Sequence, residues 1–371
     1  MNKATGVFGL LIVVCLITAI LNPLFLGETN LYNSMRWTAE FGIISIGVVF
    51  VIVTGGIDLS IGSLIALAGT IMAWLLQKSG WDPAPTIALI LCLSATLGLT
   101  HGLLITKMRL QPFVVTLCGL LVYRGIARYI AGTESLQWEA NKFDSLREIA
   151  LGKPFSIPMP FIKWISEGNW GSEKWNYITN QPALNEAGQT IPLDFIGWIP
   201  MPMPMIILIV LAALAGIFLN KTIYGRYLIA LGNNEEAARY SGINTDRMKL
   251  IAYTICGLMG GIGGIVFTLE LPAVQPASMG NFYELYAIAA AVLGGCSLRG
   301  GEASILGVFI AAALIRIILN ATNILGIPSD LDFAVVGAVL LLGVSGDEIF
   351  KRYAVRRRTI RQQSEGEAGK S

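Results

Sequence analysis

The chain has 371 residues, of which 54% are hydrophobic and 13% are charged, and its formal net charge is +2. Soluble domains carry about 25% charged residues, so this composition excludes an ordinary water-soluble domain and favours a membrane protein. A nearly neutral chain also gives no sign of a basic surface for nucleic acid. The five cysteines lie far apart in apolar stretches without histidine neighbours, so the sequence predicts no metal site and no cofactor.

Long apolar stretches recur along the chain and predict about ten membrane-spanning helices. A spanning helix needs about 20 mostly apolar residues, and backbone groups in lipid must be paired within their own segment, which favours helices. The expected spans are 6–25, 38–54, 61–77, 84–106, 111–131, 200–219, 248–269, 283–297, 303–320 and 331–346. We therefore expect an all-α polytopic membrane protein. The first span follows Met-Asn-Lys directly and lacks a clear cleavage site, so it is expected to be a retained anchor.

Lysine and arginine predict the orientation, because cytoplasmic segments are enriched in both. The tail at 347–371 is rich in them, and ten spans place both termini on that same, cytoplasmic side. The chain then divides into spans at 1–131, an extracytoplasmic insert at 132–199, spans at 200–346 with a cytoplasmic segment at 220–247, and the basic tail at 347–371.

Polar residues interrupt the apolar pattern at 55–63, which reads GGIDLSIGS. Gly55 and Gly56 permit backbone angles closed to other residues, and Asp58 or Ser60 can cap the helix that follows. Two interpretations stay open: a tight turn with a capped helix start, or a broken helix whose polar backbone and Asp58 line a water-filled path. A carboxylate facing lipid would cost about 3 kcal/mol, so we expect Asp58 to have a local partner. The candidate path residues are Gly55, Gly56, Asp58, Ser60, Gly62 and Ser63.

Residues 231–243 read LGNNEEAARYSGI and predict a short cytoplasmic helix. Asn233 is expected to cap it, with Glu236 three residues later completing a capping box. Glu235 and Glu236 fall in the first turn, where the helix dipole favours negative charge.

The rest of this short helix has small side chains, and a glycine follows it. Ala237 and Ala238 give a surface with little bulk, and Gly242 is placed to end the helix. A helix of about two turns is marginal in water by itself, so it needs a surface to pack against. That surface belongs either to the protein's own spans or to a separate soluble partner.

The run GLMGGIGG at 257–264 predicts close helix packing. It spaces Gly257 with Gly261 and Gly260 with Gly264, and such pairs let helix backbones approach closely. A dinucleotide-binding fingerprint is poorly supported, because the run neither follows a strand nor opens a soluble helix.

Arginines also occur inside predicted spans, where charge is costly. Arg124, Arg128 and Arg316 lie toward the outer ends of their spans. They either extend to the lipid headgroups or pair with outer acids such as Glu134 and line an outer gate.

The stretch ALGNNEEAARYSGI resembles the cytoplasmic coupling segment of the membrane permeases of ATP-binding-cassette importers for monosaccharides. These ribose-type permeases belong to the branched-chain amino acid/ribose-type inner-membrane translocator family. Similar stretches are GGIDLSIGS at 55–63, QPFVVTLCGLLVYRGIA at 111–127 and ELYAIAAAVLGGCSLRGGEASILG at 284–307. The resemblance covers nearly all of the chain except 132–199, and it implies the importer permease fold in a bacterial inner membrane.

The resemblance implies that the short cytoplasmic helix sits in a cleft of a separate ATPase subunit. The residues carried over to that role are Asn233, Glu235, Glu236, Ala237, Ala238, Ser241 and Gly242. It further implies a second permease copy, identical or a related paralogue, and a periplasmic or lipid-anchored sugar-binding protein. The permease itself is then no enzyme. The end of the chain, SEGEAGKS, imitates a phosphate-binding loop but has Ser364 in place of its first glycine, so ATP hydrolysis is expected elsewhere.

Two rival transport functions stay open. A branched-chain amino acid importer permease has a related fold and is the main alternative. An ion-coupled carrier usually needs ionisable residues at mid-membrane, of which these spans have few. The sequence does not indicate which pentose or hexose is carried.

The insert at 132–199 departs from the ribose-type pattern, in which this loop is usually short. It holds five of the eight tryptophans, namely Trp138, Trp164, Trp170, Trp175 and Trp198. Tryptophan is enriched at membrane interfaces and at protein interfaces. We expect the insert to cap the outer mouth or to widen the contact with the sugar-binding protein, with sugar stacking as a further alternative.

Overall fold

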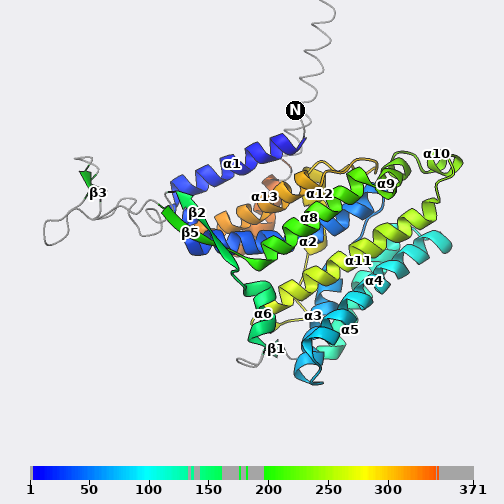
Figure 1. The fold of residues 1–371 in the computed structure, drawn as a ribbon, viewed down its shortest axis with the longest axis horizontal. Helices are drawn as coiled ribbons and strands as arrows, with labels where there is room; N and C mark the ends of the chain where they lie inside the picture. Colours follow the sequence, from blue (N-terminus) through cyan, green and yellow to red (C-terminus); the bar gives the residue numbers. More distant parts are fainter. Residues whose placement is uncertain are drawn as a thin grey trace, which may run out of the picture.

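A computed structural model describes residues 3–132, 135–137, 143–160, 175–176, 181–182, 196–339 and 341. Helices dominate this part of the chain and lie side by side in an elongated bundle (Figure 1). They are α1 (Lys3–Leu21), α2 (Glu28–Val53), α3 (Ile61–Gln77), α4 (Pro83–Lys107), α5 (Pro112–Ala131), α6 (Asp144–Leu151), α8 (Met203–Lys221), α9 (Ile223–Asn233), α10 (Glu235–Tyr240), α11 (Thr245–Glu270), α12 (Tyr283–Leu293) and α13 (Ile305–Ile324). Residues 332–339 are also helical.

The strands are short and occur in antiparallel pairs at the edge of the helical bundle. Strand β1 (Leu136–Gln137) pairs with β6 (Ala273–Val274), β2 (Phe155–Pro160) pairs with β5 (Ile196–Met201), and β3 (Trp175–Asn176) pairs with β4 (Gln181–Pro182). The longest pair matches Phe155 with Met201. These pairs do not form a sheet core, so the all-α prediction is confirmed for the spans.

Among the described residues, seven helices are long and apolar enough to cross a membrane: α1, α2, α4, α5, α8, α11 and α13. Helices α3 and α12 are apolar but shorter, with 17 and 11 residues. The predicted span at 331–346 is described only in part. The polytopic prediction therefore holds, whereas the count of ten spans is not confirmed: α3 covers all of 61–77 but has fewer than about 20 residues, and α12 covers only 283–293 of the segment at 283–297.

Helix α2 is the centre of the bundle, and 89% of the residues in its 18-residue apolar stretch are buried. It packs against α8, α11, α12 and α13. Small residues make this possible, because Gly42 faces the side chain of Leu208 and Gly47 faces that of Met259. By contrast, only 6% of the residues in the corresponding stretch of α1 are buried, and α1 packs on α13 at the edge of the bundle (Figure 1).

Helix α11 crosses the bundle beside α2, α3 and α4. The two predicted glycine pairs contact two different helices: Gly257 and Gly261 face Ser94 of α4, while Gly260 faces Leu64 and Gly264 faces Ala68 of α3. A Cβ atom at Gly257 would meet the backbone of Gly98 at 3.0 Å, so the α4 and α11 backbones touch.

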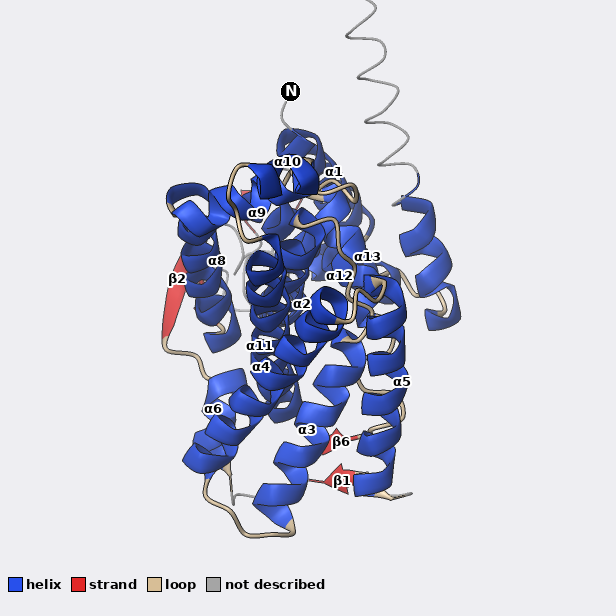
Figure 2. Cartoon of the chain, turned by 90° about the vertical axis from the view of Figure 1, so that its right-hand side faces the viewer, coloured by secondary structure: helices blue, strands red, loops and turns tan. Residues whose placement is uncertain are grey.

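The segments predicted to be cytoplasmic and extracytoplasmic lie at opposite ends of the bundle (Figure 2). Helices α9 and α10 occupy one end, and α6, β1 and β6 occupy the other. Helix α6 is fastened there by Arg147, whose Nε donates to the carbonyl oxygen of Leu269 at 3.0 Å. Trp138, Trp164 and Trp170 of the insert and the tail at 347–371 lie outside the described residues, so their predicted roles stay predictions.

Candidate functional site

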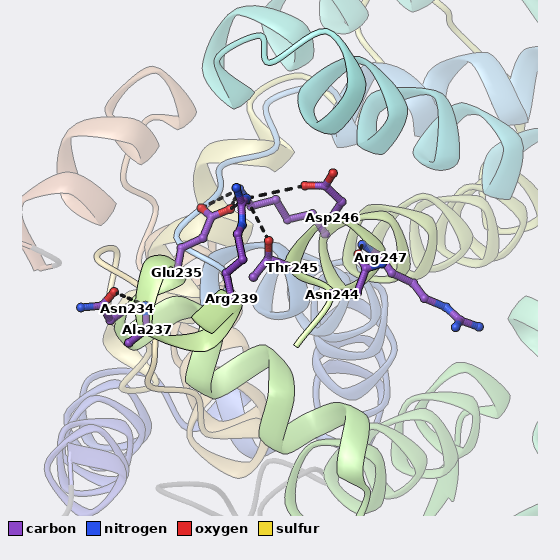
Figure 3. Close-up of polar contacts among 9 residues, drawn as sticks. Asn234, Glu235, Ala237, Arg239, Asn244, Thr245, Asp246 and Arg247 are labelled. Atoms are coloured by element: carbon purple, nitrogen blue, oxygen red, sulfur yellow. Dashed lines mark hydrogen bonds and ion pairs between the residues drawn. The ribbon is translucent and has the colours of Figure 1, made fainter. Parts of the chain in front are cut away.

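The short helix predicted near residue 235 is present as α10, and Asn234 caps it. The Asn234 side-chain oxygen accepts a hydrogen bond from the backbone nitrogen of Ala237 at 2.9 Å (Figure 3). Asn233, which we expected to be the cap, is the last residue of α9, and its Nδ2 donates to the carbonyl oxygen of Ile229. The predicted capping box is therefore wrong. The cap lies one residue later, and the third position after it is Ala237, which has no side-chain acceptor to return the bond.

Gly242 ends α10, as its sequence position predicts. Its φ is +85°, a conformation that favours glycine. The backbone nitrogen of Gly242 donates to the carbonyl oxygen of Arg239 at 3.0 Å, and that of Ile243 donates to Ala238 at 3.1 Å. This pattern satisfies carbonyl groups at the helix end and turns the chain toward α11.

The outward face of α10 differs from the one expected. Ala238 is only 4% exposed and faces the protein's own chain, whereas Tyr240 is 91% exposed. The interpretation that both alanines form the docking face is therefore wrong for Ala238. The exposed residues of α10 and its end are Glu236, Ala237, Arg239, Tyr240, Ser241 and Gly242. Tyr240 was missed because helical spacing in so short a segment does not fix which face is outside.

An ion-pair network fastens α10 to the start of α11 (Figure 3). Both Glu235 carboxylate oxygens accept hydrogen bonds from Lys249 Nζ at 2.8 Å. Arg239 donates to Glu235 at 3.2 Å and to the hydroxyl of buried Thr245 at 3.1 Å, and it lies 4.0 Å from Asp246. Partial burial by itself raises the pKa of Glu235, but Lys249 and Arg239 outweigh it and hold that pKa below its ordinary value.

The GGIDLSIGS stretch is a break between two helices. Helix α2 ends at Val53 and α3 begins at Ile61, and Gly55 has a φ of +77° at the turn between them. Asp58 is 3% exposed, and its Oδ1 accepts from the backbone nitrogen of Ser60 at 2.8 Å and from its hydroxyl at 2.7 Å. The expected local partner of Asp58 is confirmed. The capping interpretation is wrong for Ser60, whose side chain makes no cap hydrogen bond to α3.

Polar side chains from three helices surround this break. The hydroxyl groups of Tyr253 in α11 and Thr116 in α5 donate to the carbonyl oxygen of Ile57 at 3.3 and 3.4 Å. The only histidine, His101 in α4, is buried and lies 2.8 Å from the hydroxyl of Tyr123. Protein side chains from α4, α5 and α11 therefore line the break.

A second interruption meets the first. Helix α12 begins at Tyr283 after a non-helical segment at 271–282, and a Cβ at Gly62 would collide with the Glu284 carboxylate and the Gly280 carbonyl oxygen. Glu284 is 8% exposed. Two short helices, α3 and α12, therefore start side by side, with Glu284 in the first turn of α12 and Asp58 three residues before α3 begins. Ser63 is buried in the first turn of α3.

Arg124 and Arg316 do not extend to lipid headgroups. Arg124 donates to the carbonyl oxygens of Pro276 and Met279 and so holds the segment before α12. The guanidinium of Arg316 lies over the rings of Trp37 and Phe41 at 4.8 and 4.9 Å. The headgroup interpretation is therefore wrong for both, while Arg128 is exposed.

Comparison with known proteins shows the family. Residues 30–344 match the family model described as branched-chain amino acid transport system / permease component. The chain belongs to this family. The permease is 35% identical over 344 residues to the ribose import permease protein RbsC of Bacillus subtilis, covering 93% of this chain and 92% of that protein.

Two further relatives of the permease come from Escherichia coli. The ribose import permease protein RbsC is 33% identical over 338 residues, covering 91% of both chains. The xylose transport system permease protein XylH is 34% identical over 345 residues, covering 88% of this chain and 87% of that protein. No solved structure matches the permease.

Sequence reasoning missed Glu284 and Gly280 as neighbours of the break. Glu284 opens the quoted stretch ELYAIAA, so the signal available was a lone acid at the start of an apolar run. Such an acid reads equally well as an N-terminal helix charge, and only the fold brings it to Gly62.

Proposed function

We propose that this protein is the permease subunit of an ATP-binding-cassette importer for a monosaccharide, a pentose or a hexose. The observation that carries the proposal is similarity over about nine-tenths of the chain to ribose and xylose import permeases. As a member of a permease family, the protein is a multi-pass inner-membrane transport component and not an enzyme. The amino acid alternative rests on the family description alone, and none of the three relatives above is named for an amino acid.

We propose that α10 docks on a separate ATPase subunit. Its exposed surface includes Glu236, Ala237, Tyr240 and Ser241 at one end of the bundle, and Ala238 and the Glu235–Lys249 pair attach its inner side to the protein. A large exposed aromatic beside small residues is the kind of anchor that fills a pocket on a partner. This docking places α9 and α10 in the cytoplasm.

The break between α2 and α3 is the proposed path for the sugar. Asp58, Ser60 and Glu284 bring oxygen atoms to the place where α3 and α12 begin, and sugars are recognised through hydrogen bonds to their hydroxyl groups. The residues beside these oxygen atoms have small side chains or none: Gly55, Gly56, Gly62 and Ser63. A second permease copy would complete the path, and a periplasmic or lipid-anchored sugar-binding protein would deliver the sugar at the end that carries α6.

The test is co-purification of the permease with its ATPase, followed by reconstitution in vesicles with the sugar-binding protein. D-ribose and D-xylose are the probes, with L-leucine as the amino acid control. We expect one of the sugars to stimulate ATP hydrolysis and to enter the vesicles. Uptake of leucine alone, or sugar uptake without any ATPase, would contradict the proposal.

The same assay includes an arm for the path. Asp58→Asn keeps the shape of the side chain but removes its charge, so we expect lower sugar uptake at equal vesicle content of permease. Unchanged uptake by this variant would exclude Asp58 from the path.

A further inference from the structure

The end of α9 touches two other backbones directly before α10 begins. Gly232 and Asn233 are the last two residues of α9, and the cap of α10 follows at once. A Cβ atom added to Gly232 would collide with the carbonyl oxygen of Val53 and the backbone nitrogen of Gly301. The chain just before α10 therefore rests on the end of α2 and on the loop that follows α12.

These two partners are also bonded to each other. The backbone nitrogen of Gly301 donates to the carbonyl oxygen of Val53 at 3.0 Å. A Cβ at Gly300 would lie 2.8 Å from the carbonyl oxygen of Gly232 and 2.9 Å from the nitrogen of Gly55. We call the contact of Val53, Gly55, Gly232, Gly300 and Gly301 the glycine junction.

Only glycine fits most positions of the glycine junction. Gly55, Gly300 and Gly301 have φ values of +77°, +89° and +80°, which side chains rarely permit. No side chain separates the three backbones where they meet. Close-packed contacts have low compressibility, so a displacement of α9 is passed on to both neighbours and not absorbed.

Each neighbour leads to one of the interrupted helices. Val53 is the last residue of α2, and Asp58 follows five positions later in the break. The loop with Gly300 and Gly301 follows α12, an 11-residue helix that starts beside Gly62 with Glu284 in its first turn. A helix of this length is a rod of about 16 Å. Both sides of the proposed sugar path are thus tied to the end of α9.

We propose that the glycine junction transmits the movement of α10 to the break after α2 and to α12. Gly232 is the positioning residue, because it holds the end of α9 against both. Movement of α10 by the ATPase shifts the end of α9, which shifts the end of α2 and the far end of α12 together. The polar groups at Asp58 and Glu284 then change their spacing in step with the ATPase. This inference rests on the proposed docking of α10.

The test compares Gly232→Ala with Gly216→Ala. Both glycines lie in helices, but a Cβ at Gly216 in α8 has nothing within 4 Å, so the second variant is the matched control. Each is reconstituted with the ATPase and the sugar-binding protein, and ribose or xylose uptake is divided by the ATP hydrolysed. We expect Gly232→Ala to co-purify with the ATPase and to lower this ratio about fivefold or more, with Gly216→Ala unchanged.

A second pair of variants, which adds no bulk, tests the inference in case Gly232→Ala does not fold. Asn233 faces Gly301 with its side chain and donates to the carbonyl oxygen four residues earlier, and Asn220 makes the same local bond at the end of α8. Asn233→Ala is expected to lower the ratio, and Asn220→Ala to leave it unchanged.

The outcomes separate this inference from the proposed function. If the unaltered permease neither binds the ATPase nor transports sugar, the proposed function fails. If the unaltered permease transports sugar but Gly232→Ala and Asn233→Ala keep its ratio of uptake to hydrolysis, the glycine junction is static packing and the inference is overturned.

Discussion

Neighbouring alanines on α10 have opposite environments, and this difference gives a test at the scale of a single residue. Ala238 is buried against the protein, so Ala238→Trp overpacks it and should destabilise the fold by about 1–3 kcal/mol. Ala237 is exposed, so Ala237→Trp should leave the melting temperature unchanged and lower ATPase co-purification at least about tenfold by steric blockage.

Lys78→Trp serves as the control for added bulk, because Lys78 is exposed and directly follows α3, whose last turns pack with α6 and not with α10. It should affect neither property. Normal ATPase binding by a folded Ala237→Trp permease would show that the outer face of α10 does not dock.

At the scale of elements, the ion pair of Glu235 with Lys249 attaches α10 to α11. Exposed ion pairs contribute less than about 1 kcal/mol, so Lys249→Met should hardly change the free energy of unfolding. It should instead increase hydrogen exchange of the α10 amides, since α10 has only six residues. Arg247→Met is the matched control, because the Arg247 side chain points away from this network (Figure 3).

The pH dependence of α10 follows from the lowered pKa of Glu235. The stabilising contribution of this carboxylate is complete above its ordinary pKa of 4.5 and is lost as the pH falls through the lower folded value. Protection of α10 amides should therefore be constant between about pH 8 and pH 6 and should fall only under strongly acidic conditions. Loss of protection already near neutral pH would assign the attachment to another group.

Sequence reasoning found the elements but not their junctions. The run NNEEAARYSGI predicts a short helix because acids precede small residues and a glycine follows, and α10 is that helix. It offers two adjacent asparagines, and only the turn of the chain out of α9 selects Asn234 over Asn233 as the cap. In the same way, the apolar run at 61–77 predicts the 17-residue helix α3, but it does not show that α3 starts beside Glu284.

For the whole molecule, long-range contacts between backbones were beyond prediction. The run GLMGGIGG predicts close packing, but spacing alone does not show that its glycines contact both α3 and α4. The glycine junction joins residues near 53, 232 and 300, which no local pattern connects. Lysine and arginine predict that α9 and α10 lie on the cytoplasmic side, and this prediction leads to a test of orientation.

Orientation can be measured with single cysteines in a permease whose five native cysteines are replaced. Ser79 follows α3, whose last turns pack against α6, and Ser241 follows α10, which lies at the opposite end of the bundle from α6 (Figure 2). In intact cells a membrane-impermeant maleimide should label Ser79→Cys and should label Ser241→Cys only after the membrane is opened. The cysteine-free permease gives the background. Labelling of Ser241→Cys from outside intact cells would reverse the orientation, place α10 away from the cytoplasm and remove the ATPase as its partner.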